Sequence, residues 1–320
     1  MTKKTRKISR PYLSIPITLD EVLSTLANTK GPLSSSHLAE LSDLNPDSFS
    51  QFCAAWQKFG TTKRRNILLR LEELGDENVG LNFDNIFKLG LGDKYAQVRS
   101  AAINGLWENR QTWLRQKLVN FAAGDASAKV RLAAVRGLER FCLDAELRNE
   151  SGTGRQLADT LLSIFENTDA SIEMRRRALE AVSPLDLPEV RKALESAFHS
   201  ENRDLKVSAI YGMGASSNPR WLTLLMPELK NSDAETRYEA AYACGKIGEE
   251  DPINLLIALL DDEDRDVQLA AIRALGRIGG GESKEVLTGI AESPDELLSD
   301  AAKQALYELG LYDDPLSPDI

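Results

Sequence analysis

The chain has 320 residues, of which 42% are hydrophobic and 28% are charged, and these values are typical of a folded protein rather than of a disordered one. Its formal net charge of −10 argues against a broad phosphate-binding surface, because such a surface needs Lys and Arg side chains to displace counterions. No apolar stretch approaches the ~20 residues that span a bilayer, so we expect no membrane span.

Residues 1–17 are predicted to form a basic, disordered tail. Residues 1–10 hold five basic side chains and no acid, which leaves a net charge of −15 on residues 11–320. Two interpretations stay open: a solvated tail without a ligand, or an electrostatic anchor for RNA, an acidic protein or anionic lipid. The basic start does not continue into the apolar core of a signal peptide, because Pro11 and Pro16 interrupt it.

Residues 18–75 are predicted to form degenerate N-terminal capping helices. In their second half, Phe52 and Trp56 fit the apolar stripe of one amphipathic helix, and Leu68 and Leu71 fit that of the next. We expect these helices to cover the open end of the array that follows.

A repeated segment occupies residues 76–310. Its clear copies start at Val98 and Val130 and read Val-Arg-x-Ala-Ala-x-x-Gly-Leu. A fixed period of about 31 residues predicts a repeat array of antiparallel helix pairs, in which each pair covers the apolar face of its neighbour. The second helix of one pair is expected over about 266–278. The same frame starts again, at intervals of 31 residues after the first of them, at Met174, Leu205, Thr236, Val267 and Leu298.

Two columns of this array are interpreted as structural. Small residues fill one position of the second helices, where they let neighbouring helices approach. An acid in the turn between helices precedes an Arg by six residues, and we expect it to accept backbone N–H bonds and to meet the Arg of its own or an adjacent repeat. The small residues are Gly105, Gly137, Ala181, Gly212, Ala243, Ala274 and Ala305, and the acid–Arg pairs are Asp93–Arg99, Asp125–Arg131 and Asp169–Arg175.

The spacing breaks once, between Val130 and Met174, where 44 residues separate the two starts. The excess of 13 residues falls near 143–156, and its polar, Gly-containing end predicts an exposed loop. Such an insertion can belong to a binding face or be neutral, and the sequence leaves both interpretations open. Residues 311–320 are predicted to be an acidic C-terminal tail that does not continue the last helix.

The segment from Asp262 to Gly279 carries a family resemblance. It follows the pattern Asp-x-Asp/Glu-x-x-Val-Arg-x-Ala-Ala-x-x-Ala-Leu-Gly-x-Ile-Gly, and so resembles the short HEAT-like repeat of phycobilisome lyase subunits and of many unrelated proteins. The resemblance covers about residues 76–310. It implies an all-α fold, a right-handed α-solenoid whose second helices line a concave face, and a partner that is another protein.

The sequence lacks the residues that the known enzymes with this repeat use. Deoxyhypusine hydroxylases, which share the repeat, bind iron through His-Glu pairs, whereas the histidines here are His37, followed by Leu38, and His199, followed by Ser200. The acidic body argues against a DNA glycosylase of the HEAT-like type. We therefore predict no catalytic residues, no metal and no cofactor. Three cysteines without a Cys-x-x-Cys pair indicate reduced thiols, and hence a cytoplasmic protein.

The concave surface is the candidate binding site. On the second helices, the position after the consensus Arg and the position four residues further on share a stripe. Tyr238 and Tyr242 lie one turn apart there, and Tyr211 is equivalent to Tyr242 one repeat earlier. Tyr and Arg grouped in this way are typical of protein-binding hot spots. The proposed contacts to a protein or extended peptide are Tyr211, Tyr238, Tyr242, Leu269, Arg273, Val207, Arg136 and Trp107.

Two alternatives to this site stay open. The tyrosines could simply pack between adjacent helices with their hydroxyls in water. By family analogy alone, the chain could also be a phycobilin-lyase-like accessory subunit that acts on a tetrapyrrole-carrying protein. Nucleic acid is not expected as a partner, except through the basic tail.

Overall fold

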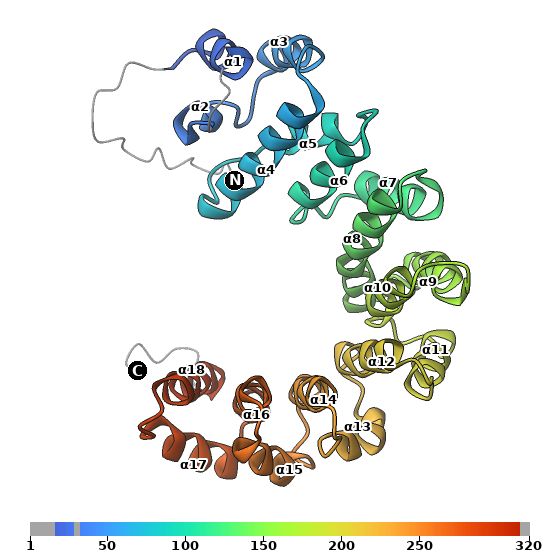
Figure 1. Ribbon diagram of the computed structural model, residues 1–320, viewed down its shortest axis with the longest axis vertical. Coiled ribbons are helices and arrows are strands. Elements are labelled where there is room, and N and C mark those ends of the chain that lie inside the picture. The colour runs from blue at the N-terminus through green and yellow to red at the C-terminus, as the bar shows by residue number, and fades with distance from the viewer. Residues whose placement is uncertain (1–16, 29–32, 314–320) are drawn as a thin grey trace. The chain divides into compact units, whose positions relative to one another are not determined.

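The computed structural model describes residues 17–28 and 33–313, and all of its elements are helices (Figure 1). The all-α prediction is therefore confirmed. Of the two predicted tails, residues 1–16 and 314–320 lie outside the described part. Residues 311–313 were assigned to the C-terminal tail wrongly, because they continue the last helix. The chain divides into two compact units, with the boundary between Asn109 and Arg110, and we call them the N-terminal and the C-terminal unit.

The N-terminal unit is built from helices around a core that combines aliphatic and aromatic side chains. Phe52 and Trp56 are buried, with ring centroids 5.7 Å apart. The Asn45 side chain begins the third helix by accepting the Ser48 N–H at 3.0 Å, ahead of a Pro in the first turn. The helices of this unit are α1 (Leu19–Asn28), α2 (Ser35–Ala39), α3 (Pro46–Trp56), α4 (Thr61–Glu77), α5 (Asp84–Gly90) and α6 (Ala96–Gly105).

The C-terminal unit is a solenoid of helix pairs. In Figure 1 the first helices of the pairs form its outer row, and the second helices follow one another along its inner row. The outer row contains α7 (Thr112–Gly124), α9 (Ser151–Glu166), α11 (Pro188–Phe198), α13 (Leu222–Glu228), α15 (Ile253–Ala258) and α17 (Gly280–Ala291). The inner row contains α8 (Ala128–Leu147), α10 (Ile172–Val182), α12 (Arg203–Ala215), α14 (Ala234–Ile247), α16 (Arg265–Ile278) and α18 (Glu296–Asp313). The right-handed sense of the superhelix stays a prediction.

A column of glycines lets the later second helices touch. A Cβ placed on Gly245 would lie 2.6 Å from the α-carbon of Ala274, which belongs to the next second helix. Gly214 meets Ala243 at the same distance, so each glycine packs on a member of the predicted small column. These helices thus approach through their backbones, which explains why small residues return every 31 positions. In the N-terminal unit Gly105 is small for another reason, since its Cβ would lie 2.0 Å from the Phe87 ring.

The turn residue and the Arg six positions later form a ladder. The guanidinium nitrogens of one Arg can bind two different turns, which the sequence did not show. Arg237 donates from Nη1 to the backbone oxygen of Asn231 in its own turn, at 2.8 Å. Its Nε and Nη2 bind both carboxylate oxygens of Asp262 in the next turn, each at 2.7 Å. In the N-terminal unit Arg64 likewise binds Asp93 of the following turn at 2.7 Å. At these two places the ladder therefore ties one repeat to the next.

Asn can replace Asp in this turn because the side-chain oxygen mainly accepts a backbone N–H. Asn231 Oδ1 accepts the N–H of Asp233 at 2.9 Å, as Asp93 Oδ1 accepts that of Tyr95. The Asp169–Arg175 pair was assigned wrongly. The turn residue there is Asn167, which accepts the Asp169 N–H at 3.0 Å, and Arg175 donates to the Phe165 backbone oxygen.

The prediction of an exposed loop near 143–156 was also wrong. The extra residues lengthen two helices, α8 with 20 residues and α9 with 16, and only residues 148–150 separate them. The added turns continue the buried stripe, since Ala145 and Leu157 lie in the core. Gly154, which suggested a loop, is buried in the first turn of α9, where a Cβ would lie 3.2 Å from the Leu185 side chain.

Candidate functional site

Two tyrosines of the inner row stack face to face. The rings of Tyr211 on α12 and Tyr242 on α14 are 6.3 Å apart between centroids and inclined by 4°. They meet because they occupy the same repeat position on helices that touch through Gly214 and Ala243. Equivalent side chains on neighbouring helices are thereby brought into register.

The stack is extended at both ends. The Tyr211 hydroxyl donates to Glu139 Oε1 on α8 at 3.0 Å, across the intervening α10. At the other end, the Arg277 guanidinium of α16 lies 5.0 Å from the centroid of the Tyr242 ring, within cation–π range. We call Glu139, Tyr211, Tyr242 and Arg277 the tyrosine row. It presents an anion, two aromatic rings and a cation in sequence along four second helices.

Burial sets the protonation of the anionic end of the row. Burial raises the pKa of Glu139, and the hydrogen bond from Tyr211 opposes that shift. Burial and the neighbouring Glu139 carboxylate raise the pKa of Tyr211. Tyr211 therefore stays a neutral phenol whose hydroxyl donates a hydrogen bond to Glu139. This hydrogen bond fixes the orientation of the Tyr211 ring.

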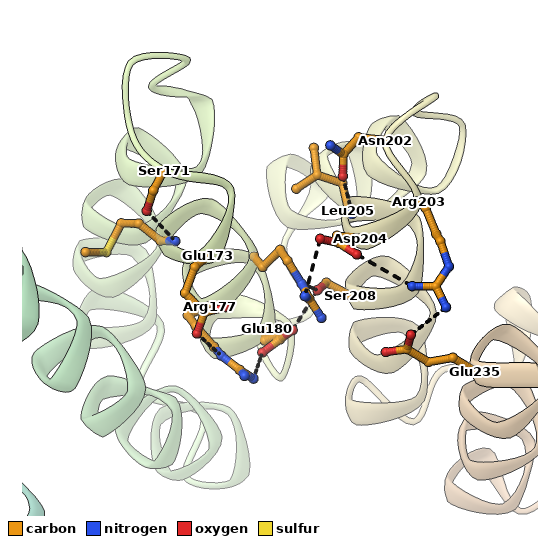
Figure 2. A network of polar contacts seen from close by, with 12 residues as sticks. Ser171, Glu173, Arg177, Glu180, Asn202, Arg203, Asp204, Leu205, Ser208 and Glu235 are labelled. Carbon is orange, nitrogen blue, oxygen red and sulfur yellow. Dashed lines mark hydrogen bonds and ion pairs between the residues drawn. The ribbon is translucent and has the colours of Figure 1, made fainter.

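A polar network joins the second helices beside the tyrosine row (Figure 2). Glu173 accepts hydrogen bonds from Arg136 of α8 at 2.7 Å and from Arg177 of its own helix at 3.1 Å. Arg177 also donates to the buried Glu180 at 2.7 Å, and Glu180 accepts the Ser208 hydroxyl of α12 at 2.6 Å. The buried charge of Glu180 is thus matched by a cation and a hydrogen bond.

The network continues toward α14. Arg176 donates to the Ser208 hydroxyl at 2.8 Å and lies 3.8 Å from Asp204. Arg203, on the same helix as Asp204, donates to Glu235 at 2.6 Å at the start of α14 (Figure 2). These contacts link three successive second helices, α10, α12 and α14.

Glu239 is a group in this region whose charge is not matched by another described residue. It is half-buried on α14 and has no hydrogen bond or ion pair within the part of the chain that the structure describes. Burial raises its pKa to about 7, with Glu180 and Glu235 adding to the shift and Arg176 opposing it. Sequence reasoning missed this residue, although it lies three positions before Tyr242 and so on the same stripe.

The structure brings together some of the predicted contact residues. Tyr211 and Tyr242 meet in the tyrosine row, whereas Tyr238 is half-buried and makes no ring contact or hydrogen bond with another described residue. Leu269 is half-buried on α16. Arg273 is exposed one turn further along, and it pairs with no acid among the described residues.

Val207 does not belong to the surface, and its assignment there was wrong. Its side chain is 3% exposed, in the core of the unit. The column it occupies lies at the edge between core and surface. The long Tyr238 and Leu269 side chains reach out from that position, while the short side chains of Val207 and Ser100 stay buried.

Of the other two predicted residues, Arg136 is exposed and paired with Glu173, as described above. Trp107 is half-exposed, and its indole N–H donates to Asp76 at 3.1 Å within the N-terminal unit. Glu139 and Arg277, which sequence reasoning missed, lie three and four residues after predicted members of the stripe. The helical spacing rule could have found them.

Residues 17–28 and 33–313 contain no group of three His, Cys, Asp or Glu side chains that could hold a metal ion. Burial raises the pKa of Cys244 to about 12, so this thiol stays protonated. A search of the same residues finds no helix that combines the length and the apolar character of a membrane span.

Comparisons with known proteins identify the repeat. Residues 222–307 match the model for HEAT repeats. No match to a curated protein sequence was found. Among solved structures, Kap95p, which binds RanGDP, aligns with 12% identity and a TM-score of 0.51 over 93% of this chain and 46% of its own. Importin beta aligns with 14% identity and a TM-score of 0.50 over 91% and 44%. The chain thus spans less than half of either structure.

An enzyme also resembles the chain, more weakly. Human deoxyhypusine hydroxylase aligns with 18% identity over 91% of this chain and 96% of its own, with a TM-score of 0.35. At these identities the likenesses concern the fold alone, and a TM-score this low carries no argument even for that. None of the comparisons supports a phycobilin-lyase-like activity.

Proposed function

Since the chain is a HEAT-like repeat protein with an α-solenoid fold, we propose that it is a non-enzymatic scaffold that binds an extended segment of another protein. The segment lies across the second helices of the C-terminal unit, along the tyrosine row. Tyr238, Leu269 and Arg273 contribute the flanking contacts. We place this scaffold in the cytoplasm, in keeping with its unpaired cysteines.

The tyrosine row is the observation that carries this proposal. Tyr and Arg are enriched in protein interfaces because their rigid, amphipathic side chains bury area at little entropic cost. The stack of Tyr211 and Tyr242 leaves both rings half-buried, so each still offers surface to a partner. The network around Glu180 holds the helices that carry the rings, which reduces the ordering cost of binding.

The unmatched charges indicate what the segment carries. Glu239 has no cationic partner on the described surface, and Arg273 has no anionic one. A segment that has a basic side chain opposite Glu239 and an acidic one opposite Arg273 satisfies both. Its orientation along the row is then fixed by charge as well as by shape.

The test is a pull-down from native lysate with the full chain and with a Tyr238→Ala/Tyr242→Ala variant, followed by affinity measurement on the recovered partner. We expect the double variant to weaken binding by about tenfold or more, the effect of losing a hot-spot residue. Tyr307→Ala is the matched control, because Tyr307 is an exposed tyrosine on α18 with no ring contact to another described residue.

Two results would contradict the proposal. One is recovery of the same partners at the same affinity by the double variant and by the wild type. The other is an equal loss with Tyr307→Ala, which would place binding elsewhere. Circular dichroism melting of both variants separates lost binding from lost folding.

A further inference from the structure

The N-terminal unit contains a cavity of about 290 Å³ between the end of α4, the start of α5 and the residues after α6. Its walls combine carboxylates with aromatic rings, and no Lys or Arg lines it. The carboxylates are Glu72, Asp76, Asp84 and Glu108, and the rings are Phe83, Phe87 and Trp107.

Two of the four carboxylates hold the walls in place. Asp76, in the last turn of α4, accepts the indole N–H of Trp107 at 3.1 Å. Asp84, in the first turn of α5, accepts the side-chain amide of the buried Asn109 at 2.7 Å. The rim includes apolar surface, because Trp107 and Val79 are both exposed there.

The other two carboxylates have no partner. Neither Glu72 nor Glu108 forms a hydrogen bond or ion pair with any described residue. Glu72 is half-buried, and burial together with the charges of Asp76 and Glu73 raises its pKa. An unpaired carboxylate in such a position is costly, and a bound cation would remove the cost.

We propose that this cavity binds the side chain of an arginine from a partner protein. A guanidinium group is planar, so it can stack on the Trp107 indole while its N–H groups bind the Glu72 carboxylate. The aliphatic stem then lies along the rim formed by Val79. Lysine fits less well, because its compact ammonium is more strongly hydrated and has no face to stack.

This site is independent of the tyrosine row, since all of its residues lie in the N-terminal unit. A failure of either proposal would leave the other standing.

The test uses the full chain labelled with ¹⁵N and three capped peptides, Gly-Arg-Gly, Gly-Lys-Gly and Gly-citrulline-Gly. The indole N–H resonance of Trp107 reports binding directly. We expect saturable shifts with the arginine peptide in the millimolar range, which corresponds to about 4 kcal/mol. Citrulline keeps the shape of arginine and removes the charge, so it should cause no saturable shift.

Glu72→Gln should weaken arginine binding about fivefold or more, the loss of one charge-assisted hydrogen bond. Its melting temperature should not fall, because the substitution removes an unpaired charge. Glu73→Gln is the matched control: Glu73 is the adjacent residue on α4, but it is exposed and pairs with Arg70 outside the cavity. Equal shifts with citrulline, equal binding of lysine, or unchanged binding by Glu72→Gln would each overturn the proposal.

Discussion

At one position of the repeat, nine residues after the start of its frame, Gly245 of the C-terminal unit and Trp107 of the N-terminal unit are side chains of opposite size. The C-terminal unit has Gly245 there, on which the backbone of the next second helix packs directly. The N-terminal unit has Trp107, which stands half-exposed and borders a cavity. A glycine at this position thus closes the space between repeats, and a tryptophan leaves it open. In these two repeats the same position produces a close helix contact in one and a pocket in the other.

The arginine ladder is the feature that both units share, and breaking it gives the largest expected effect. Arg237→Ala should lower the free energy of unfolding by about 3–4 kcal/mol, because Asp262 is left buried and unpaired. Arg64→Ala should cost a similar amount through Asp93. Urea denaturation followed by circular dichroism measures both.

Arg265→Ala is the matched control for the ladder. Arg265 also reaches forward to an acid of the next repeat, Asp295, but half of its side chain is exposed. We expect a loss of at most about 1 kcal/mol, as for surface ion pairs. A large effect here, or a small one at Arg237, would show that burial does not decide the strength of the ladder.

The close contact between second helices through a glycine can be tested at Gly245. Gly245→Ala should destabilise the chain by about 2–3 kcal/mol, because its Cβ meets the Ala274 backbone, which cannot rotate away. Gly289→Ala, in α17, is the control: no atom lies within 4 Å of its Cβ, so helix propensity should leave it neutral or slightly stabilising. If the two variants had the same melting temperature, the explanation by close packing at Gly245 would be contradicted.

At Gly105 in the N-terminal unit, two positions earlier in the repeat, the clash involves a side chain. Gly105→Ala meets the Phe87 ring, so Phe87→Leu should recover part of the loss in the double variant. No such rescue is available at Gly245, where Ala274→Gly removes a methyl group but leaves the clash with the main chain. Equal coupling in the two double-mutant cycles would remove the distinction between the two glycine positions.

The smallest effect concerns Glu239, whose folded-state pKa is raised to about 7. The folded protein holds this proton more tightly than the unfolded chain does, so the contribution of Glu239 to stability is greatest below pH 4.5 and falls as the pH rises to 7. Glu239→Gln should therefore stabilise the protein by about 1–2 kcal/mol at pH 8, and change little at pH 4. Glu201→Gln, an exposed glutamate with no described partner, should show no such pH dependence in the same melts.

The sequence predicted the repeat well, because the periodicity fixes the place of each residue within a helix pair. The second helix expected over 266–278 is α16, Arg265–Ile278, and Tyr211 and Tyr242 were placed on the same stripe. Periodicity does not say how closely two pairs approach. The glycine column was therefore overlooked, and the depth of Val207 was misjudged.

The missed contacts join residues far apart in the chain. Tyr211 and Glu139 are 72 residues apart, a distance that no local pattern spans. The cavity beside Trp107 depends on where α4 ends and α5 begins, in a part of the chain where the frame is weakest. The insertion near 143–156 was misread because its glycines were assigned to a loop, whereas Gly154 is buried against another helix.

The bond from Tyr211 to Glu139 has a consequence for how the solenoid comes apart. In an ideal solenoid each repeat contacts only its neighbours, so stability is a sum of nearest-neighbour contributions and unfolding can stop at any interface. This bond passes over α10 and links α8 to α12. A boundary between folded and unfolded repeats that falls between α8 and α12 must break it, whichever side melts first. Opening the solenoid at either interface between α8 and α12 therefore costs this hydrogen bond in addition to the contacts between neighbours, a contribution of about 1 kcal/mol.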